Sequence, residues 1–298
     1  MRRLIIVYNP RSSKHARVEK EVLEPARNLK GFLIGKYEIK PTNVDDNAVA
    51  LAKILEDGDL VVTAGGDGTA TIGLNSVALS KKDVALSVLG YGNFNDLART
   101  LGCKNLKDVV NGTVRQFYPL EAEVNGKHWR YAGAYITVGM FAESAALFDK
   151  KEVRNKLKAG KGGLVFSIVN LAKWYFRHRK KVFLPTFRLN DKVYEKQTDY
   201  LAINGKSVAK VMRGGRWSFN KATFKQGVAN LRNFFKLCFF MARSILFGVP
   251  GQETTEDFLE FDKPAKVQLH AEGEYKMFET VKTIKISKAK TSIKVVTK

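Results

Sequence analysis

The sequence predicts two domains of different class: an N-terminal α/β domain over residues 1–115 and a C-terminal β domain over residues 116–298. Up to about residue 110, short β-branched runs alternate with stretches of helical periodicity, which is typical of a parallel sheet covered by helices on both faces. Beyond residue 114, strand-like runs follow one another and are joined by turn dipeptides, which indicates an antiparallel sandwich or barrel. A length of 298 residues suits two domains, and the strand-like C-terminal end is free to return to the first sheet.

The N-terminal domain is expected to alternate strands and helices. Its first helix places Val18, Val22 and Ala26 on one face, and its second begins near Asp45, where a helix start favours acidic residues. The expected strands are Leu4–Tyr8, Tyr37–Lys40, Leu60–Thr63 and Val84–Leu89, and the expected helices are Ser13–Leu29, the segment from Asp45 to Asp57-Gly58, and Thr69–Ser80.

Two hairpins are expected in the C-terminal domain. Asn125-Gly126, the strongest short hairpin signal, lies between the strand-like runs Tyr118–Val124 and Trp129–Val138. Asn190-Asp191 lies in the same way between Lys181–Leu189 and Val193–Ile203. The runs Lys266–Ala271 and Thr280–Val296 are also expected to be mostly strand.

Two apolar, aromatic segments interrupt this β-rich pattern. Gly162–Phe176 and Asn230–Phe247 both carry or adjoin Lys and Arg residues. Two interpretations remain open: each segment is a helix that packs on the sheet as core, or each is an amphipathic helix that lies in a membrane interface.

The chain is strongly basic, with a formal net charge of +22. Such a surface attracts nucleic acids, anionic lipid headgroups and nucleotide phosphates, although no fold signature of a specific nucleic-acid binder is present. Cys103 and Cys238 are the only cysteines, so a reducing cytosol is expected. No run of roughly 18 apolar residues predicts a membrane-spanning helix.

The sequence VVTAGGDGTATIG, residues 61–73, predicts a phosphate site. Glycines between a strand and a helix let backbone N–H groups approach an anion, and the helix start adds its dipole. The pattern is neither a P-loop nor a dinucleotide fingerprint. Asp67 could hold amides of the turn, orient Mg²⁺ through water or accept a proton; the alternative is an ordinary Asp-Gly turn.

Three further segments accompany this turn: Asn9-Pro10-Arg11-Ser12-Ser13 after the first strand, LGYGNFNDLARTLG at residues 89–102, and Glu272-Gly273-Glu274. Together with Gly-Gly-Asp-Gly-Thr at residues 65–69, they resemble, in the same order, motifs of the diacylglycerol kinase and sphingosine kinase-like lipid kinases, in a soluble bacterial form. Gly-Gly-Asp-Gly-Thr alone is similar to NAD kinases as well. The resemblance covers nearly the whole chain.

This resemblance implies a Rossmann-like N-terminal domain, related to phosphofructokinases and NAD kinases, that binds ATP with Mg²⁺. It implies a C-terminal antiparallel β-sandwich that binds lipid, with the active site between the domains. The implied base is Glu274, with Glu272 as its acidic partner and Asp67 as an organiser of ATP and metal. On a continuous strand the two glutamates would share a face, whereas a turn at Gly273 would separate them. The implied nucleotide site comprises Asn9, Pro10, Arg11, Ser12, Ser13, Thr42, Gly65, Gly66, Asp67, Gly68, Thr69, Ala70, Thr71, Tyr91, Asn95 and Asp96.

The expected function is therefore that of an ATP-dependent lipid kinase that phosphorylates a primary hydroxyl, such as that of diacylglycerol. The protein is expected in the cytoplasm, peripheral to the anionic inner membrane surface, and sheet edges leave a homodimer open. Ile72, Tyr91, the inserted Asn93-Phe94 and Glu272 depart from the family pattern. They keep two alternatives open: an NAD kinase, or a lipid- or nucleotide-binding pseudokinase.

Overall fold

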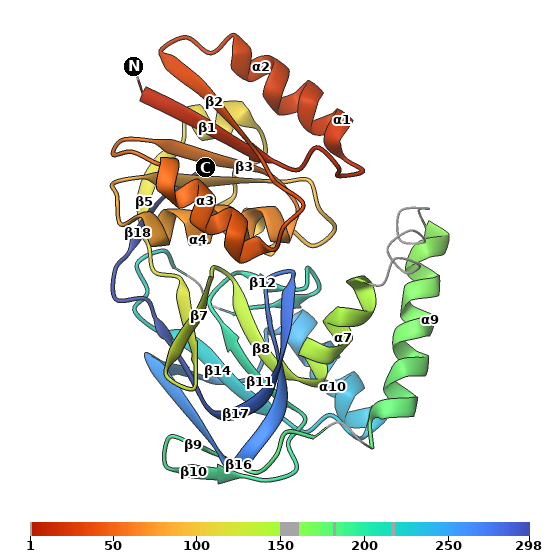
Figure 1. Cartoon of the computed structure of the whole chain (residues 1–298). Helices are drawn as coiled ribbons and strands as arrows, with labels where there is room; N and C mark the ends of the chain where they lie inside the picture. The colour runs from red at the N-terminus through yellow and green to blue at the C-terminus, as the bar shows by residue number, and fades with distance from the viewer. Residues whose placement is uncertain (1, 150–160, 181–182, 216–217) are drawn as a thin grey trace.

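The structure is a computed structural model that describes residues 2–149, 161–180, 183–215 and 218–298. Figure 1 shows an α/β domain above a domain built mainly of strands. The elements of the α/β domain are β1 (Arg2–Tyr8), α1 (His15–Val18), the π-helical η1 (Glu19–Leu23), α2 (Glu24–Arg27), β2 (Phe32–Glu38), α3 (Val44–Ile54), β3 (Leu60–Gly65), α4 (Asp67–Ser80), β4 (Ala85–Gly90), α5 (Asp96–Leu101), α6 (Leu106–Val110), β5 (Thr113–Phe117) and β18 (Ile293–Thr297).

The first sheet has the strand order β2-β1-β3-β4-β18-β5, and β5 is its antiparallel member. Residues of α1, η1, α2 and α6 pack on one face, and those of α3 and α4 on the other (Figure 1). The last strand, β18, is buried on both faces, because Val295 belongs to one core cluster and Val296 to the other. The C-terminal end of the chain therefore completes the sheet of the N-terminal domain.

The expected helix Ser13–Leu29 forms as a continuous helical segment with a π turn in its middle. Pro25 lies just after that turn and has no N–H to donate to the preceding turn. The second strand differs from the expectation, because it begins at Phe32 and not at Tyr37. It begins with the apolar residues Phe32, Leu33 and Ile34, but Leu33 is exposed and the other side chains of the strand are half-buried or exposed, so the strand lacks a buried face of its own.

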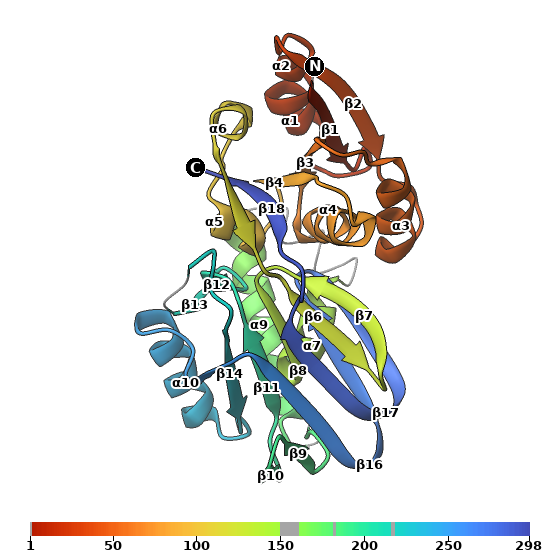
Figure 2. The same cartoon turned by 90° about the vertical axis from the view of Figure 1, so that its left-hand side faces the viewer.

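The second domain contains one large antiparallel sheet with the path β15-β14-β11-β8-β16-β17-β6-β7, to which β9 and β10 are attached. The sheet curls around a single core cluster that includes Phe187, Tyr200, Phe224 and Phe261 (Figure 2). This confirms the antiparallel C-terminal domain. Its elements are β6 (Leu120–Val124), β7 (Lys127–Ala132), β8 (Tyr135–Gly139), α7 (Met140–Asp149), α9 (Lys161–His178), β9 (Phe187–Leu189), β10 (Lys192–Tyr194), β11 (Asp199–Ile203), β12 (Ser207–Val208), β13 (Met212–Arg213), β14 (Phe224–Ala229), α10 (Phe234–Leu246), β15 (Gln252–Thr254), β16 (Glu256–Ala271) and β17 (Glu274–Lys288).

The first expected hairpin forms with Asn125-Gly126 as its two-residue turn, but its second strand ends at Ala132 and β8 begins at Tyr135. The second expected hairpin is only partly correct. Asn190-Asp191 joins the short strands β9 and β10, and residues 181 and 182 of its expected first strand lie outside the described part of the chain. Residues 199–203 form a separate strand, β11, that pairs with β8 and β14.

The two basic, aromatic segments are helical, as α9 and α10. No helix among the described residues is long and apolar enough to cross a membrane.

Candidate active site

The glycine turn of residues 65–68 lies between β3 and α4, at the carboxyl edge of the first sheet. Gly66 precedes the helix, and no side chain caps the helix start. A Cβ on Gly92 would lie 2.5 Å from Cα of Gly66, so the loops after β3 and β4 meet backbone to backbone. The uncapped end of α4, with its backbone N–H groups and positive dipole end, is therefore a candidate anion site.

Asp67 joins this turn to the start of α5. Its carboxylate accepts the backbone N–H groups of Asn95, at 3.1 Å, and Asp96, at 3.0 Å. Burial of the carboxyl group, and then the nearby Asp96 carboxyl, raise the pKa of Asp67 above its ordinary value. Asp67 therefore holds together the loops after β3 and β4, which carry two of the sequence motifs.

The loop after β4 is closed by its own side chains. The Asn95 side chain accepts the N–H of Gly92 at 2.7 Å and donates to the Gly92 carbonyl at 2.9 Å. The Tyr91 hydroxyl lies 3.1 Å from a carboxylate oxygen of Glu21, and the Arg17 guanidinium lies over the Tyr91 ring. Tyr91 is thus buried against the first helical segment. The contacts of Tyr91 fix the loop after β4 to the first helical segment.

Asp96 connects the two domains. One carboxylate oxygen accepts the Ser207 hydroxyl at 2.5 Å and the Lys210 N–H at 2.9 Å. The other oxygen, Oδ2, is buried without a hydrogen-bond partner among the described residues. A buried carboxylate oxygen that lacks a partner is costly, so this atom is available to a cation.

The tip of the β16–β17 hairpin reaches the glycine turn from the second domain. Glu272 and Gly273 have φ values of +39° and +83°, as the two central residues of a type I′ turn require. A Cβ on Gly273 would lie 2.7 Å from Cβ of Asp67. The His270 ring, whose pKa burial lowers to about 4, is neutral, and its Nε2 accepts the Gly273 N–H at 3.1 Å.

This turn separates the two glutamates. Glu272 is 2% exposed, and its carboxylate accepts the N–H groups of Gly133 and Ala134. Gly133 and Ala134 interrupt the strand between β7 and β8, so the Glu272 carboxyl group satisfies the N–H groups that this interruption leaves without a strand partner. Burial, together with Asp67 and Asp96, raises the pKa of Glu272 to about 8 although the two N–H groups oppose this shift. Its carbonyl oxygen accepts the Thr71 hydroxyl at 3.0 Å.

Glu274 has the opposite environment. It is the first residue of β17 and is partly exposed. A Cβ on Gly68 would lie 3.1 Å from its Oε1, so the carboxylate lies beside the first turn of α4. One acid is therefore fixed inside the domain interface, and the other lies beside the candidate anion site at the start of α4.

The remaining predicted residues lie after β1 and β2, at the same carboxyl edge of the sheet. Asn9 begins a tight turn by accepting the Arg11 N–H at 3.0 Å, and the Ser12 carbonyl accepts the His15 N–H at 3.0 Å. Thr42 is exposed, and its hydroxyl accepts the Asn47 side chain at 2.9 Å. Because β1 to β4 are parallel, these loops share one edge with the glycine turn.

Three buried asparagines that organise the site were not predicted. The Asn47 side chain accepts a hydrogen bond from the Lys40 N–H and donates one to the Lys40 carbonyl, and it thereby closes the loop that carries Thr42. Asn75, inside α4, exchanges two hydrogen bonds with the backbone of Tyr131 in the second domain. Asn204 donates to the carbonyl of Gly133 at 2.9 Å. A polar residue within the apolar stretch of α4 was a usable signal for Asn75, whereas Asn47 lies in the first turn of α3 beside other polar residues and Asn204 lies in the loop after β11.

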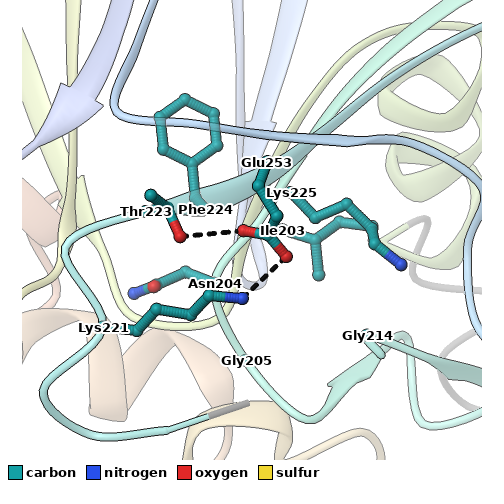
Figure 3. A pocket seen from close by; sticks show the side chains of 9 residues that line it. All are labelled: Ile203, Asn204, Gly205, Gly214, Lys221, Thr223, Phe224, Lys225 and Glu253. Carbon is teal, nitrogen blue, oxygen red and sulfur yellow. Dashed lines mark hydrogen bonds and ion pairs between the residues drawn. The ribbon is translucent and has the colours of Figure 1, made fainter. Parts of the chain in front are cut away.

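A small hollow of about 10 Å³ lies in the second domain between Gly214 and Glu253 (Figure 3). The Glu253 carboxylate accepts Lys221 at 2.7 Å and the Thr223 hydroxyl at 2.9 Å. None of the predicted site residues lines it. Asn204, which also donates to the Gly133 carbonyl, is one of its lining residues, so the hollow adjoins the candidate active site from the second domain.

Comparison with known proteins bears on both domains. Residues 3–117 match the family described as the diacylglycerol kinase catalytic domain. A diacylglycerol kinase of Bacillus subtilis (strain 168) is 34% identical over 140 residues, which cover 43% of this chain and 44% of that protein. A Staphylococcus carnosus (strain TM300) protein named as a candidate lipid kinase is 24% identical over 156 residues, covering 50% and 47%. The matches span somewhat less than half the length of these curated relatives.

The solved structures extend the likeness to the whole fold. A Bacillus anthracis str. Sterne protein named as a candidate diacylglycerol kinase superimposes with a TM-score of 0.68 at 17% identity, covering 99% of this chain and 97% of that one. Another structure, named as a diacylglycerol kinase of the same strain, gives 0.65 at 14% identity with the same coverage. At these identities the likeness shows the fold, including the second domain, which lies outside the family match to residues 3–117.

Proposed function

We propose that this protein is a lipid kinase that transfers the terminal phosphoryl group of ATP to a primary hydroxyl of a lipid such as diacylglycerol, because residues 3–117 match the diacylglycerol kinase catalytic domain family. The family match supports a lipid kinase as the general class of function. The acceptor lipid, the use of ATP and the roles of the residues are our proposal.

The position of Glu274 beside Gly68 carries this proposal. Phosphoryl transfer needs an anion site that positions the phosphate and a base close to the acceptor hydroxyl. In the proposed step, Glu274 takes the hydroxyl proton as the lipid oxygen bonds to the terminal phosphorus. The bond from that phosphorus to the bridging oxygen breaks, and ADP leaves. Glu272 cannot share this role, since both of its carboxylate oxygens accept backbone N–H groups; it positions the turn.

We assign the nucleotide to the carboxyl edge of the first sheet. The uncapped start of α4, Gly66–Thr71, would hold the phosphates, and the loops with Asn9–Ser13 and Thr42 would flank the rest of the molecule. Asp67, Asn95 and Tyr91 would act on the nucleotide through the shape of the loops they fix, since their polar groups already have partners in the protein.

The residues present fit a magnesium ion. Mg²⁺ is usually held by one or two carboxylates together with substrate phosphates and water. Among the described residues no cluster of three acidic, histidine or cysteine side chains forms a complete cage, but Asp96 Oδ2 is buried and has no partner. Asp96, next to Asp67, would hold the ion. When bound, Mg²⁺ would neutralise phosphate charge during transfer.

A direct assay tests this function. Purified protein is incubated with Mg²⁺, labelled ATP and diacylglycerol, sphingoid-base or polyprenol acceptors, and lipid-dependent label transfer is expected. Absence of transfer to every acceptor would contradict the proposal. Formation of NADP from NAD would instead support the NAD kinase alternative, which the comparisons do not favour.

The first variant prediction concerns the base. Glu274→Gln is expected to lower kcat by at least about 100-fold, a typical contribution of general base catalysis, with little change in KM for ATP or in Tm. Glu279→Gln is the matched control, because Glu279 lies exposed on the same strand and pairs with Lys266 at the surface. Equal kcat for Glu274→Gln and the wild type would remove Glu274 from the mechanism. ATP binding without turnover in the wild type would support the pseudokinase alternative.

We further propose that the protein works in the cytoplasm at the surface of an anionic membrane, where its acceptor lies. Nucleic-acid binding by this +22 chain would be nonspecific and salt-dependent. A homodimer remains a prediction from the sheet edges.

A further inference from the structure

Helix α10 has two apolar faces, of which the protein covers only one. Phe240 is buried against the second domain. On the other side, Phe235, Phe239 and Leu246 are spaced i, i+4 and i+11, which places them on one face of a helix. They are 80%, 71% and 60% exposed, and Phe247, just after the helix, is 79% exposed. Figure 2 shows α10 on the flank of the second domain beside β14.

The exposed apolar surface continues onto the end of α9. The Phe176 ring, half-exposed, lies 5.3 Å from the Phe234 ring between ring centres. Arg179 lies over Phe176 at 5.2 Å. Two helices that are far apart in sequence therefore share one aromatic cluster, and contiguous exposed patches of this kind mark interaction sites.

The charges around this surface indicate its partner. Helix α10 contains Lys236 and Arg243 and no acidic residue, and α9 ends near Arg177, Arg179 and Lys180. Basic side chains beside exposed aromatic ones match a layer of anionic lipid headgroups over acyl chains. The same charges disfavour a second copy of this chain, because two surfaces of a +22 protein would repel each other.

We propose that the outer face of α10, together with the end of α9, is a membrane-docking surface that inserts Phe235, Phe239, Leu246 and Phe247 into an anionic bilayer. The inference rests on the proposed function for its purpose, since a kinase of membrane lipids must reach its acceptor at a bilayer.

A short hairpin joins this surface to the candidate active site. The Arg213 side chain, from β13, donates to the Leu246 carbonyl at the end of α10 at 3.2 Å. The preceding residues Ser207 and Lys210 hold Asp96 through their hydroxyl and N–H groups. Docking through α10 would therefore fix the membrane next to an element that contacts the site.

Vesicle binding tests the proposal. Sedimentation with vesicles of phosphatidylcholine and phosphatidylglycerol, without ATP, is compared for the wild type and the combined variant Phe235→Ser, Phe239→Ser and Phe247→Ser. Because burial of apolar aromatic side chains drives insertion into a bilayer, binding is expected to fall at least about tenfold. Leu33→Ser with Val193→Ser is the matched control: these side chains are 60% and 54% exposed on other surfaces, and binding should stay within about twofold.

A second readout uses the native thiol Cys238, which is exposed on α10 whereas Cys103 is buried. An environment-sensitive fluorophore on Cys238 should shift to shorter wavelength with these vesicles and much less with pure phosphatidylcholine. Unchanged vesicle binding by the triple variant, or an unshifted fluorophore, would overturn the docking surface. A wild-type dimer that the triple variant abolishes, without loss of vesicle binding, would assign the face to a second copy.

A water-soluble acceptor separates kinase activity from membrane docking. With a short-chain, water-soluble diacylglycerol the triple variant should transfer phosphate at the wild-type rate, while transfer to vesicle-borne acceptor should fall with binding. No transfer to any acceptor would contradict the kinase function, and the vesicle result would still decide the docking surface. Equal transfer to vesicle-borne acceptor by both proteins would overturn the docking surface alone.

Discussion

Glu272 and Glu274 are two residues apart in sequence but have different surroundings, and the buried one gives a pH prediction. The pKa of Glu272 rises from about 4.5 in the unfolded chain to about 8 in the folded protein. The folded state therefore binds this proton more tightly. The contribution of Glu272 to the free energy of unfolding is complete below pH 4.5 and is lost as the pH rises to about 8.

Glu272→Gln isolates this contribution. An amide nitrogen cannot accept an N–H, so one of Gly133 and Ala134 would lose its partner, at a cost of about 1–3 kcal/mol at about pH 5. The free energy of unfolding of the wild type, taken relative to that of the variant, should fall as the pH rises from 5 to 8. Urea unfolding across this range measures it, and other titrating groups cancel in the comparison. A difference that is constant or that widens with pH would contradict the prediction.

At the residue scale, the roles of the predicted site residues remain predictions, and their surroundings were not visible in the sequence. Asp67 follows from a motif, and its contact with the loop that carries Asn95 and Asp96 agrees with the joint occurrence of the two motifs. The motif that contains Tyr91 gives no information on Glu21, which holds the Tyr91 hydroxyl from 70 positions away in the sequence. Such contacts depend on tertiary packing, which a local pattern does not encode.

At the element scale, the β16–β17 turn gives a prediction with a close control. Gly273→Ala introduces strain at φ +83° and a Cβ 2.7 Å from Cβ of Asp67. Gly126→Ala introduces similar strain at φ +74° in the other type I′ turn but meets no atom within 4 Å. Both should lose about 1–2 kcal/mol of stability from the backbone, and only Gly273→Ala should also lower kcat/KM, by at least about tenfold.

Chemical denaturation and the label-transfer assay measure these two effects. Equal losses of activity in the two variants would show that the turn does not have to approach Asp67 closely.

Elements with strong local signals were predicted well, and pairings were predicted poorly. The Asn125-Gly126 turn fixes its own hairpin, because its residues adopt positive φ readily. Asn190-Asp191 fixes only the short strands β9 and β10, and β11 instead finds partners in β8 and β14. The burial of Tyr200 and Ala202 in the common core provides the reason, which is visible only when the sheet has curled.

At the scale of the whole molecule, the two domains are linked by the last strand, β18, which returns to the first sheet, and by side-chain contacts between them. Asn75 bonds to Tyr131, Asp96 to Ser207, and Arg130 to Asp45 at 2.6 Å. The candidate active site lies among these contacts, so it depends on both domains even though its motifs are concentrated in the first.

The last strand makes this dependence testable. Residues 3–117 contain the family match, yet β18 lies between β4 and β5 and contributes Val295 and Val296, both nearly or fully buried. A chain of residues 1–117 alone should therefore lack a cooperative thermal transition, because β5 has lost its partner and both faces of the sheet have lost core.

Attaching residues 292–298 after Phe117 through a short Gly-containing turn should restore the transition, since Phe117 and Ile293 face each other in the antiparallel β5–β18 pair and a hairpin can join them. The same joined chain with Val295→Asp and Val296→Asp is the control, and it should remain without a transition because buried charges would replace core side chains. Circular dichroism during heating measures all three chains. A sharp transition in residues 1–117 alone would show that the first domain is stable without the end of the chain, and that the returning strand serves only to position β17 and Glu274 against it.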